Sequence, residues 1–336
     1  MREFEIGANE AGQRFDKYLK KLLSNAPGSF VYKMLRKKNI VLNGKKADGT
    51  EKLVVGDAVK LFLADETFEK FSGGNRTLSE YESLKQLFYA LQKKGEILQV
   101  VYEDANVILI NKPVGLLSQK STPQDISANE QILAYLIGKG ELTEEMLRTF
   151  KPSVCNRLDR NTSGLLAAGK TLKGLQDLSK AFKERTVRKY YRCIVKGQIH
   201  ENAYIKGWLV KDEKKNKVSV TSAEPMATAE VSPQQIETEY RPIEIADGFT
   251  LLEVHLITGR SHQIRAHLAS IGHPILGDYK YGDLRLNEVL NQRLHVKSQL
   301  LHAYRMEFPD GQTVIAPCPS EFTHVWDVVN SSRNWH

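Results

Sequence analysis

The middle of the chain contains the stretch Asn156-Arg157-Leu158-Asp159-Arg160-Asn161-Thr162-Ser163-Gly164, which runs directly into Leu165-Leu166-Ala167-Ala168. The second run is short, apolar and preceded by glycine, as expected of a buried strand that follows a turn. In the turn, one aspartate stands between two arginines, whose positive charges favour an ionised carboxylate. The pattern therefore predicts an anionic Asp159 that either acts as a nucleophile or base, or holds a structural turn.

Length and composition are typical of a soluble globular protein. The chain has 336 residues, 41% hydrophobic and 26% charged, which is enough for one large and one small domain. No apolar run approaches the roughly 18 residues of a membrane span. Residues 1–12 are polar, so we expect no secretory signal. Three scattered cysteines argue against a disulfide framework and favour a reducing cytoplasm: Cys155, Cys193 and Cys318.

The net charge of the chain is +8 at pH 7. A positive protein attracts polyanions, and nucleic acid is the commonest of these in a cell. Many soluble proteins are mildly basic for no such reason. The net charge therefore favours RNA or DNA as a partner. The distribution of the charged residues along the chain is the stronger evidence.

Residues 1–64 are predicted to form a small α+β module. Apolar residues recur at helical spacing in residues 14–24 and again in residues 29–38. An apolar strand at residues 40–45 runs into an Asn-Gly turn, and residues 53–61 indicate a strand, a turn and a second strand.

This module resembles the S4 RNA-binding module. The resemblance is carried by Asp16-Lys17-Tyr18-Leu19, Val41-Leu42-Asn43-Gly44 and Val55-Gly56-Asp57. The second predicted helix turns a group of cations outward: Lys33, Arg36, Lys37 and Lys38. These four residues are predicted to contact RNA, although a solvated helix face would have the same pattern.

The remaining chain is predicted to consist of a linker and a larger domain. Residues 65–95 form the linker, with a loop at 71–76 and a short helix at 78–94. The larger domain covers residues 96–336. Its expected helices are 127–150, broken near 138–140, and 171–183, and its expected strands are 107–110, 165–168, 189–195, 250–256 and 301–308. Strands outnumber helices, which predicts an α+β fold with a mixed, largely antiparallel sheet.

The central stretch resembles the motif of the RluA-type RNA pseudouridine synthases, His-Arg-Leu-Asp-Arg-x-Thr-Ser-Gly. Further segments match that family in order: Asn111-Lys112-Pro113-Val114-Gly115-Leu116, Lys189-Tyr190-Tyr191-Arg192-Cys193-Ile194-Val195-Lys196-Gly197, the segment from Leu256 through Thr258-Gly259-Arg260-Ser261-His262-Gln263-Ile264-Arg265 to Leu268, Gly272-His273-Pro274-Ile275-Leu276-Gly277-Asp278, and Leu301-His302-Ala303. The resemblance covers about residues 96–320 and, with the S4-like module, nearly the whole chain.

The resemblance implies an isomerase that detaches uracil from C1′ of its ribose, rotates it and rejoins it through C5. The exchange happens within one nucleotide, so no cofactor and no metal are expected. By match to the family, Asp159 is the nucleophile or base, Tyr191 stacks on the base, and Arg265 pairs with the carboxylate. Whether Asp159 attacks the base or acts at the sugar stays open. A uridine in a stem must be flipped out to reach such a group.

The same resemblance implies the RNA contacts. Arg157 is expected to fill the space left by the flipped uridine, and Arg160, Arg260 and His262 are expected to contact RNA. The expected helix around Arg265 begins near Ser261 as N-cap, with Ile264, Leu268 and Ile271 on the core. One position departs from the family, because Asn156 stands where histidine is usual. Asparagine cannot titrate near neutral pH, so we expect a structural role there.

Three other functions are compatible with parts of the pattern. The chain could be a non-catalytic RNA-binding or ribosome-assembly protein that keeps a degenerate synthase domain. Four histidines could suggest a metal site (His255, His262, His267 and His273), but His262 and His267 are five apart and do not share a helix face. A Ser–His hydrolase is disfavoured because no Gly-x-Ser-x-Gly elbow occurs and Ser163 is expected in the turn rather than beside a base.

The partner implied by the resemblance is RNA, namely large-subunit ribosomal RNA or its precursor, with transfer RNA as an open alternative. No membrane contact and no obligate protein partner are indicated. Which uridine is modified cannot be read from side-chain identities, because RNA is recognised largely by shape and by flipped bases.

Overall fold

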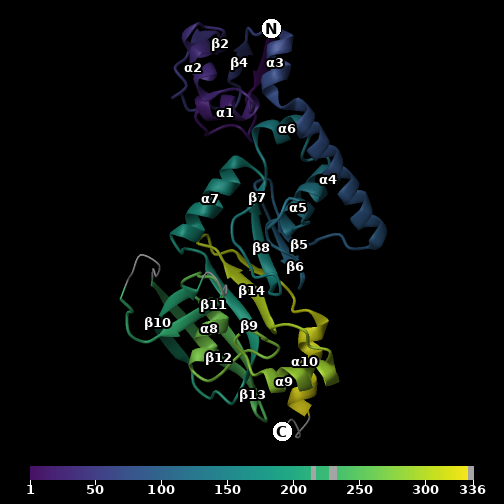
Figure 1. The fold of residues 1–336 in the computed structure, drawn as a ribbon, viewed down its shortest axis with the longest axis vertical. Helices are drawn as coiled ribbons and strands as arrows, with labels where there is room; N and C mark the ends of the chain where they lie inside the picture. Colours follow the sequence, from purple (N-terminus) through teal and green to yellow (C-terminus); the bar gives the residue numbers. More distant parts are fainter. Residues whose placement is uncertain (213–216, 227–232, 332–336) are drawn as a thin grey trace. The chain divides into compact units, whose positions relative to one another are not determined.

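A computed structural model describes residues 1–212, 217–226 and 233–331 of the chain (Figure 1). In these ranges it contains 15 strands and 10 helices. The predicted α+β class is therefore confirmed, as is the excess of strands. No helix within the described ranges is both long enough and apolar enough to cross a bilayer.

The first residues contain two helices and four short strands, and their being a separate domain stays a prediction. These elements are β1 Arg2–Glu5, α1 Phe15–Leu22, α2 Gly28–Arg36, β2 Ile40–Leu42, β3 Lys45–Lys46 and β4 Ala58–Leu61. The strands pair antiparallel in the order β1-β4-β2-β3. Between β2 and β3, Asn43 and Gly44 have φ of 51° and 71°, as a two-residue hairpin turn requires.

The core of this region comes from the periodic apolar residues of both helices. Phe15, Leu19, Leu35 and Val59 are at most 1% exposed. The predicted strand at 53–55 is wrong, because Val54 and Val55 lie in a loop with exposures of 60% and 66%. Apolar composition alone indicated a strand there, but no neighbouring strand pairs with this segment in the described residues.

Two helices follow, α3 Asp65–Ser72 and α4 Gly74–Lys94. The predicted loop at 71–76 is wrong, because a single residue separates the helices. Gly73 adopts the left-handed conformation with φ of 63°, which ends α3 without a longer loop. That this segment serves as a linker between residues 1–64 and 96–336 stays a prediction.

The chain forms two compact units, each assembled from several segments. Unit 1 comprises residues 1–109, 119–156 and 167–180, and unit 2 comprises residues 110–118, 157–166 and 181–336. The further elements of unit 1, some of which continue into unit 2, are β5 Gln99–Glu103, β6 Val107–Lys112, α5 Ala128–Gly138, α6 Glu144–Thr149, β7 Ser153–Val154, β8 Ser163–Gly169 and α7 Leu172–Lys183. The predicted helix at 127–150 is thus two helices, and Ser127 and Glu130 form a capping box at the first.

Unit 2 contains most of the large sheet. Its further elements are β9 Arg188–Lys196, β10 Ala203–Asp212, β11 Lys217–Thr221, β12 Gln234–Ala246, β13 Phe249–Leu256, α8 Gln263–Ser270, α9 Leu284–Leu294, β14 Leu301–Glu307, β15 Thr313–Ile315 and α10 Ser320–Ser331. The strand order is β11-β10-β12-β13-β9-β14-β8. Every neighbouring pair is antiparallel except β14 and β8, which are parallel. The prediction of a mixed, largely antiparallel sheet is confirmed.

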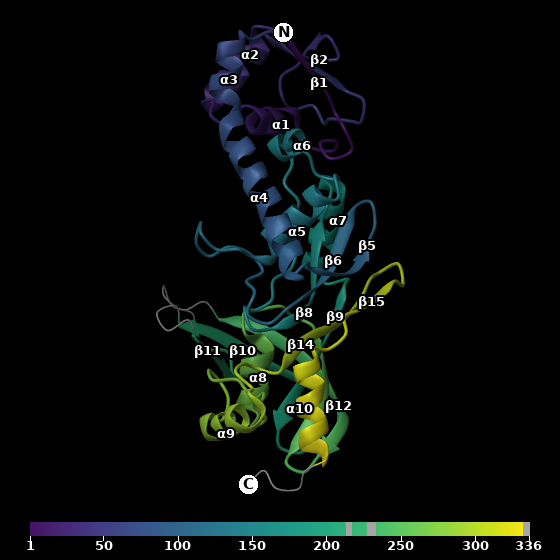
Figure 2. The same ribbon diagram turned by 90° about the vertical axis from the view of Figure 1, so that its right-hand side faces the viewer.

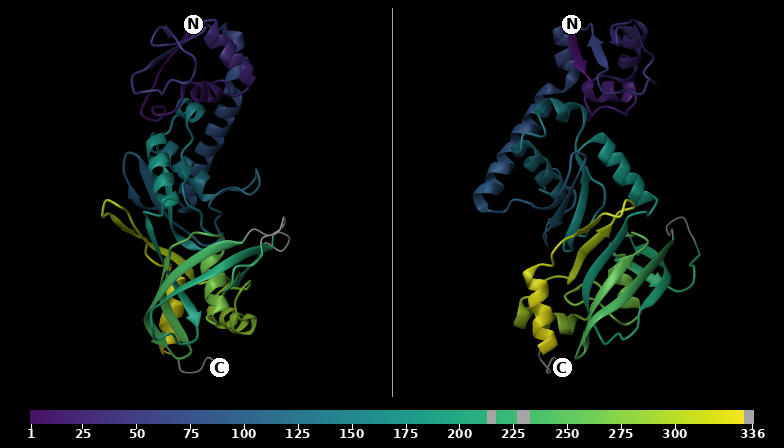
Figure 3. Two further views of the ribbon diagram at one scale, coloured as in Figure 1. Left: turned by 90° about the vertical axis from the view of Figure 1, so that its left-hand side faces the viewer. Right: turned by 180° about the vertical axis from the view of Figure 1, so that it is seen from behind.

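The two faces of this sheet are covered by different helices, which can be followed in Figures 2 and 3. Ile194 of β9 packs with Phe322 and Trp326 of α10. On the other face, Ile236 of β12 packs with Ala266 of α8. Side chains alternate along a strand, and the register places Tyr191 on the α8 face. The sheet therefore carries Tyr191 and α8 on the same side.

Candidate active site

Asp159 lies in the turn before β8, and its carboxylate meets α8. The Nη1 atom of Arg265 donates a hydrogen bond to Oδ2 of Asp159 over 2.8 Å. The Asp159 side chain remains 26% exposed, whereas that of Arg265 is 9% exposed. A charge-assisted bond of this kind orients a carboxylate, and the remaining exposure leaves Asp159 open to a ligand. The structure thus brings together two of the three residues predicted to be catalytic.

Asp278 holds the other side of the same guanidinium group. Its side chain is fully buried, and it accepts hydrogen bonds from Nε of Arg265 over 2.7 Å and from Nη2 over 2.9 Å. The backbone N–H groups of Lys280 and Tyr281 also donate to Asp278. Burial disfavours the charged guanidinium, but Asp278 and Asp159 outweigh it and raise the pKa of Arg265. Sequence reasoning missed Asp278, although it ends one of the matched segments.

The start of α8 differs from the prediction. The N-cap is His262, in the left-handed conformation with φ of 56°, and not Ser261. The Gln263 side chain accepts a hydrogen bond from the Arg260 backbone N–H over 3.1 Å. A side chain within the first turn of the helix therefore provides the acceptor for a backbone N–H of the preceding loop. Ile264 and Leu268 are buried as predicted, but Ile271 is 37% exposed because the helix has ended at Ser270.

The loop around Asp159 is tied down by a buried lysine. Lys112 is 0% exposed, and its Nζ donates to the carbonyl oxygens of Pro113, Leu116 and Arg160. Every hydrogen of the ammonium group therefore has an acceptor. Gly164 is required for a different reason, because a Cβ there would lie 2.2 Å from the Ala303 carbonyl oxygen. These contacts explain why the Asn-Lys-Pro segment and the terminal glycine accompany the aspartate.

Asn156 fills the position where the resembling motif has histidine. Its side-chain Oδ1 accepts a hydrogen bond from the backbone N–H of Ala167 over 2.8 Å. Asn156 and Ala167 both belong to unit 1. The side chain thus joins the turn to the strand that follows it, which is a structural contact.

Tyr191 is the third residue predicted to be catalytic. It is 6% exposed and lies on the sheet face covered by α8. Burial, together with the negative charge of Asp159, raises the pKa of the Tyr191 hydroxyl. At neutral pH the hydroxyl is therefore protonated and available as a hydrogen-bond donor.

His262 lies beside the Asp159 carboxylate. Its Nε2 is 3.9 Å from Oδ2 of Asp159, and its Nδ1 is 2.8 Å from the hydroxyl of Tyr281. That hydroxyl also accepts a hydrogen bond from the backbone N–H of Val218. Burial lowers the pKa of His262, with Asp159 opposing and Arg265 and Lys280 reinforcing the effect. A neutral imidazole therefore borders the site at pH 7.

The other residues predicted to contact RNA are on the surface. Arg157, Arg160 and Arg260 are exposed side chains of unit 2, and Nε of Arg160 donates to the Gly115 carbonyl oxygen over 3.0 Å. The basic helix residues are also exposed and belong to unit 1: Lys33, Arg36, Lys37 and Lys38.

Ser163 corrects a prediction, because it does lie beside a base. Its Oγ is 2.9 Å from Nδ1 of His302, and Nε2 of His302 is 3.1 Å from the Ala316 carbonyl oxygen. Nε2 must carry the proton to donate to that carbonyl, so Nδ1 accepts from Ser163. His302 is 0% exposed and Ser163 is 3% exposed. Because both residues are sealed in the core, no substrate can reach the hydroxyl, and the pair does not act in hydrolysis although its geometry resembles that of an activated serine.

The other three histidines of the possible metal site have separate partners, and that of His273 is the Lys196 carbonyl oxygen, 3.0 Å from Nδ1. His267 is buried with Nδ1 3.0 Å from the Thr238 hydroxyl, and Nδ1 of His255 is 3.2 Å from the Glu239 carboxylate. In the part of the chain that the structure describes, no three His, Cys, Asp or Glu side chains gather as a metal site would require.

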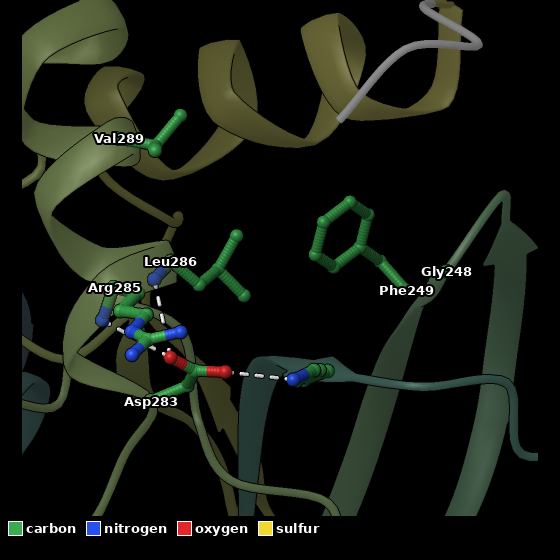
Figure 4. Close-up of a pocket in the computed structure, with 7 residues that line it drawn as sticks. Gly248, Phe249, Asp283, Arg285, Leu286 and Val289 are labelled. Atoms are coloured by element: carbon green, nitrogen blue, oxygen red, sulfur yellow. Dashed lines mark hydrogen bonds and ion pairs between the residues drawn. The ribbon is translucent and has the colours of Figure 1, made fainter. Parts of the chain in front are cut away.

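A pocket of about 270 Å³ lies elsewhere in unit 2, between the start of α9 and the β12–β13 turn (Figure 4). It is lined by Lys196, Gly248, Phe249, Asp283, Arg285, Leu286 and Val289. Two of its charged groups bind each other, because Lys196 contacts Asp283 over 2.7 Å, and Asp283 also caps α9. The Asp159 region, where an arginine holds a partly exposed carboxylate, is therefore the candidate site.

Comparisons with known proteins identify the family. A sequence model described as RNA pseudouridylate synthase matches residues 106–270, the range that holds Asp159, Tyr191 and Arg265. A solved structure entitled human RNA pseudouridylate synthase domain containing 4 has the same fold, with a TM-score of 0.58 at 20% identity, and covers 74% of this chain and 97% of that one.

Curated relatives match nearly the full length. One from Vibrio cholerae, named ribosomal large subunit pseudouridine synthase C, is 30% identical over 307 residues, which is 90% of this chain and 87% of the relative. A relative of the same name from Vibrio vulnificus is 29% identical over 339 residues, 98% of this chain and 96% of the relative. The chain belongs to the RluA-type RNA pseudouridine synthases and is an isomerase that acts on RNA.

Proposed function

We propose that the chain converts a uridine of large-subunit ribosomal RNA to pseudouridine in the cytoplasm, with Asp159 as the essential carboxylate. The single observation that carries this is the arrangement of Asp159, partly open and oriented by an arginine that Asp278 fixes from behind. The substrate follows from the relatives, which are named for the ribosomal large subunit. The net positive charge of +8 supports an RNA substrate.

The reaction is an exchange of bonds within one nucleotide. The bond between N1 and C1′ breaks, the base turns, and C5 bonds to C1′; a proton leaves C5 and N1 takes one up. Because the atoms and electrons balance, no cofactor or metal is needed. Asp159 acts as nucleophile or base, Arg265 orients its carboxylate, and the protonated Tyr191 hydroxyl offers a hydrogen-bond donor.

The target uridine has to leave the RNA stack to reach Asp159, which costs a few kcal/mol by general experience with base flipping. Exposed Arg157, Arg160 and Arg260 are suited to hold the RNA around the flipped nucleotide, and His262 borders the carboxylate. Residues 1–64 are proposed as an S4-like module that adds affinity through its basic helix.

The test of the basic helix is a triple variant, Lys33→Ala, Arg36→Ala and Lys37→Ala. Each lost phosphate contact is expected to reduce the salt slope of RNA binding by about one unit. Measuring the dissociation constant against salt concentration decides this. An unchanged slope contradicts the proposed role of the helix and leaves that of Asp159 untouched.

The test of the catalytic role is Asp159→Asn, with Asp247→Asn as an exposed control in the same unit. Asparagine keeps the size of the side chain but is neither a nucleophile nor a base, so pseudouridine formation is expected to vanish while RNA binding survives. Pseudouridine mapping of total RNA from cells with wild-type protein, the variant or no protein measures this. Retained modification by Asp159→Asn contradicts the assignment, and loss of a transfer RNA site instead of a ribosomal one contradicts the substrate.

A further inference from the structure

Lys189 lies on the same strand and the same face as Tyr191. Both belong to β9, two residues apart, and the register pairs Lys189 with Met306 and Tyr191 with Val254. Residues two apart on a strand are about 7 Å apart along it and point to the same side. The Lys189 side chain therefore extends along the α8 face, next to the tyrosine of the candidate active site.

The Lys189 ammonium group is partly buried against a glycine. The chain at Gly259 comes so close that a Cβ there would lie 3.2 Å from Nζ of Lys189. Gly259 belongs to the loop that connects β13 with α8, and α8 carries Arg265. The absence of a side chain at this position gives the ammonium group its place beside the loop.

Within the described ranges, no anion accompanies this cation. Among the described residues, no carboxylate lies within ion-pair distance of Lys189, Arg185 or Arg260. Burial lowers the pKa of Lys189, and the charge of Arg185 lowers it further. Two other buried lysines have partners: Lys170 contacts Glu103 and Glu141, and Lys112 donates to three backbone carbonyl oxygens.

A partly desolvated cation next to a second cation is unfavourable unless an anion joins it. We propose that Arg185, Lys189 and Arg260 form a binding site for a backbone phosphate of the RNA, adjacent to the flipped uridine. The inference rests on the proposed function and adds a subsite to it. Phosphate is the anion that the substrate carries at every nucleotide, and the site lies between the Tyr191 strand and the loop that leads to Arg265.

RNA affinity and folding stability are expected to respond differently to a change at Lys189. If Lys189 had a structural role, Lys189→Met would lower the melting temperature. If Lys189 instead binds RNA, Lys189→Met is expected to leave the melting temperature unchanged or higher and to weaken RNA binding. Methionine keeps the apolar stem of the side chain but not its charge.

The experiment measures binding of full-length protein to a large-subunit ribosomal RNA transcript over a range of salt concentrations. Lys189→Met is expected to weaken binding about tenfold and to reduce the salt slope by about one unit, while Lys189→Arg retains both. Lys297→Met, at an exposed lysine of the same unit, is the control and leaves both unchanged. Arg260→Ala, which removes only an exposed side chain, is expected to reduce the slope even if Lys189→Met folds poorly.

Inorganic phosphate, added at constant ionic strength, tests whether the site binds the phosphate of the RNA backbone or free phosphate. Competition that wild type shows and Lys189→Met lacks supports a phosphate site, and a transcript must still bind far more tightly than free phosphate. Equal slopes for wild type, Lys189→Met and Arg260→Ala overturn the proposal, as does free phosphate binding as tightly as RNA. If the wild type binds RNA with the expected slopes but forms no pseudouridine, the proposed function fails and the phosphate site stands.

Discussion

Two buried polar clusters of unit 2 stand four residues apart in the sequence, at Asp159 and at Ser163, and they are built in opposite ways. The first is ionic: two carboxylates share one guanidinium group, and one of the carboxylates remains 26% exposed. The second is neutral: Ser163 donates to His302, which donates to a backbone carbonyl group, and both residues are at most 3% exposed.

The difference shows which cluster can react. In the ionic cluster, Asp278 uses two of the donor groups of Arg265 and leaves Nη1 for Asp159. The two carboxylates share a single guanidinium group, and only that of Asp159 keeps an open side. In the neutral cluster every donor has an acceptor, and nothing reaches it from solvent. The first is therefore arranged for chemistry and the second for holding β8 against β14.

The largest effect is expected at the hidden member of the ionic cluster, in Asp278→Asn. The amide places a donor against the guanidinium group, so Arg265 loses its fixed position and Asp159 loses its orientation. A misplacement of about 1 Å can cost roughly a hundredfold in kcat, and breaking a buried ion pair costs about 3–5 kcal/mol. Single-turnover kinetics and denaturant unfolding measure the two effects.

The matched control for Asp278 is Asp283→Asn, five residues later. Asp283 caps α9 and binds Lys196 near the surface, so its loss should cost about 1 kcal/mol or less and leave kcat unchanged. If Asp278→Asn retains wild-type kcat, Asp278 does not position the site, and the two clusters differ less than the geometry indicates.

The sequence predicted the open part of the ionic cluster and missed its buried part. Asp159, Tyr191 and Arg265 belong to ordered motifs, and the apolar period of β8 and β9 predicted the strands that hold them. Asp278 was missed because its role depends on a side chain thirteen residues away that folding brings to it. Ser163 and His302 escaped for the same reason, since only the parallel pairing of β8 and β14 joins them.

The long strands and the last helices of unit 2 were also not predicted. β10 and β12 mix polar and apolar residues, and one half of β12 pairs with β10 while the other half does not. Only the neighbouring strands decide which of these side chains are buried. The local sequence pattern is enough to predict a strand that is buried throughout, as in β8 with every residue buried. It is not enough for strands that are only partly buried.

A smaller effect is expected in the neutral cluster, from Ser163→Ala. Removal of the hydroxyl leaves Nδ1 of His302 buried without a donor, which costs about 1–3 kcal/mol of stability. The rate per folded molecule should stay within about twofold of wild type, because the pair does not touch Asp159. Urea unfolding and single-turnover kinetics test this, with exposed Ser222→Ala as a control within about 0.5 kcal/mol. A large loss of rate in the stable fraction would place Ser163 in the catalytic machinery.

The smallest effect is a pH dependence of stability that comes from neutral, buried histidines. Burial lowers the pKa of both His302 and His267 to about 4, from 6.5 in the unfolded chain. Between these values the unfolded state binds more protons than the folded state, so stability is complete above pH 6.5 and falls as the pH drops towards 4. From pH 7 to pH 6 the loss is roughly 0.7 kcal/mol per histidine.

The measurement is urea unfolding at several pH values for wild type and for His302→Gln, which has no imidazole to titrate at that position. The variant is less stable at pH 7 because the buried contacts of His302 change, but its stability should fall less steeply between pH 7 and pH 6. Parallel pH curves for the two proteins would mean that His302 binds protons equally in the folded and unfolded states, so that burial does not lower its pKa. The cluster around Ser163 would then take up a positive charge as the pH falls through 6.5, and the contrast with Asp159 would rest on solvent exposure alone.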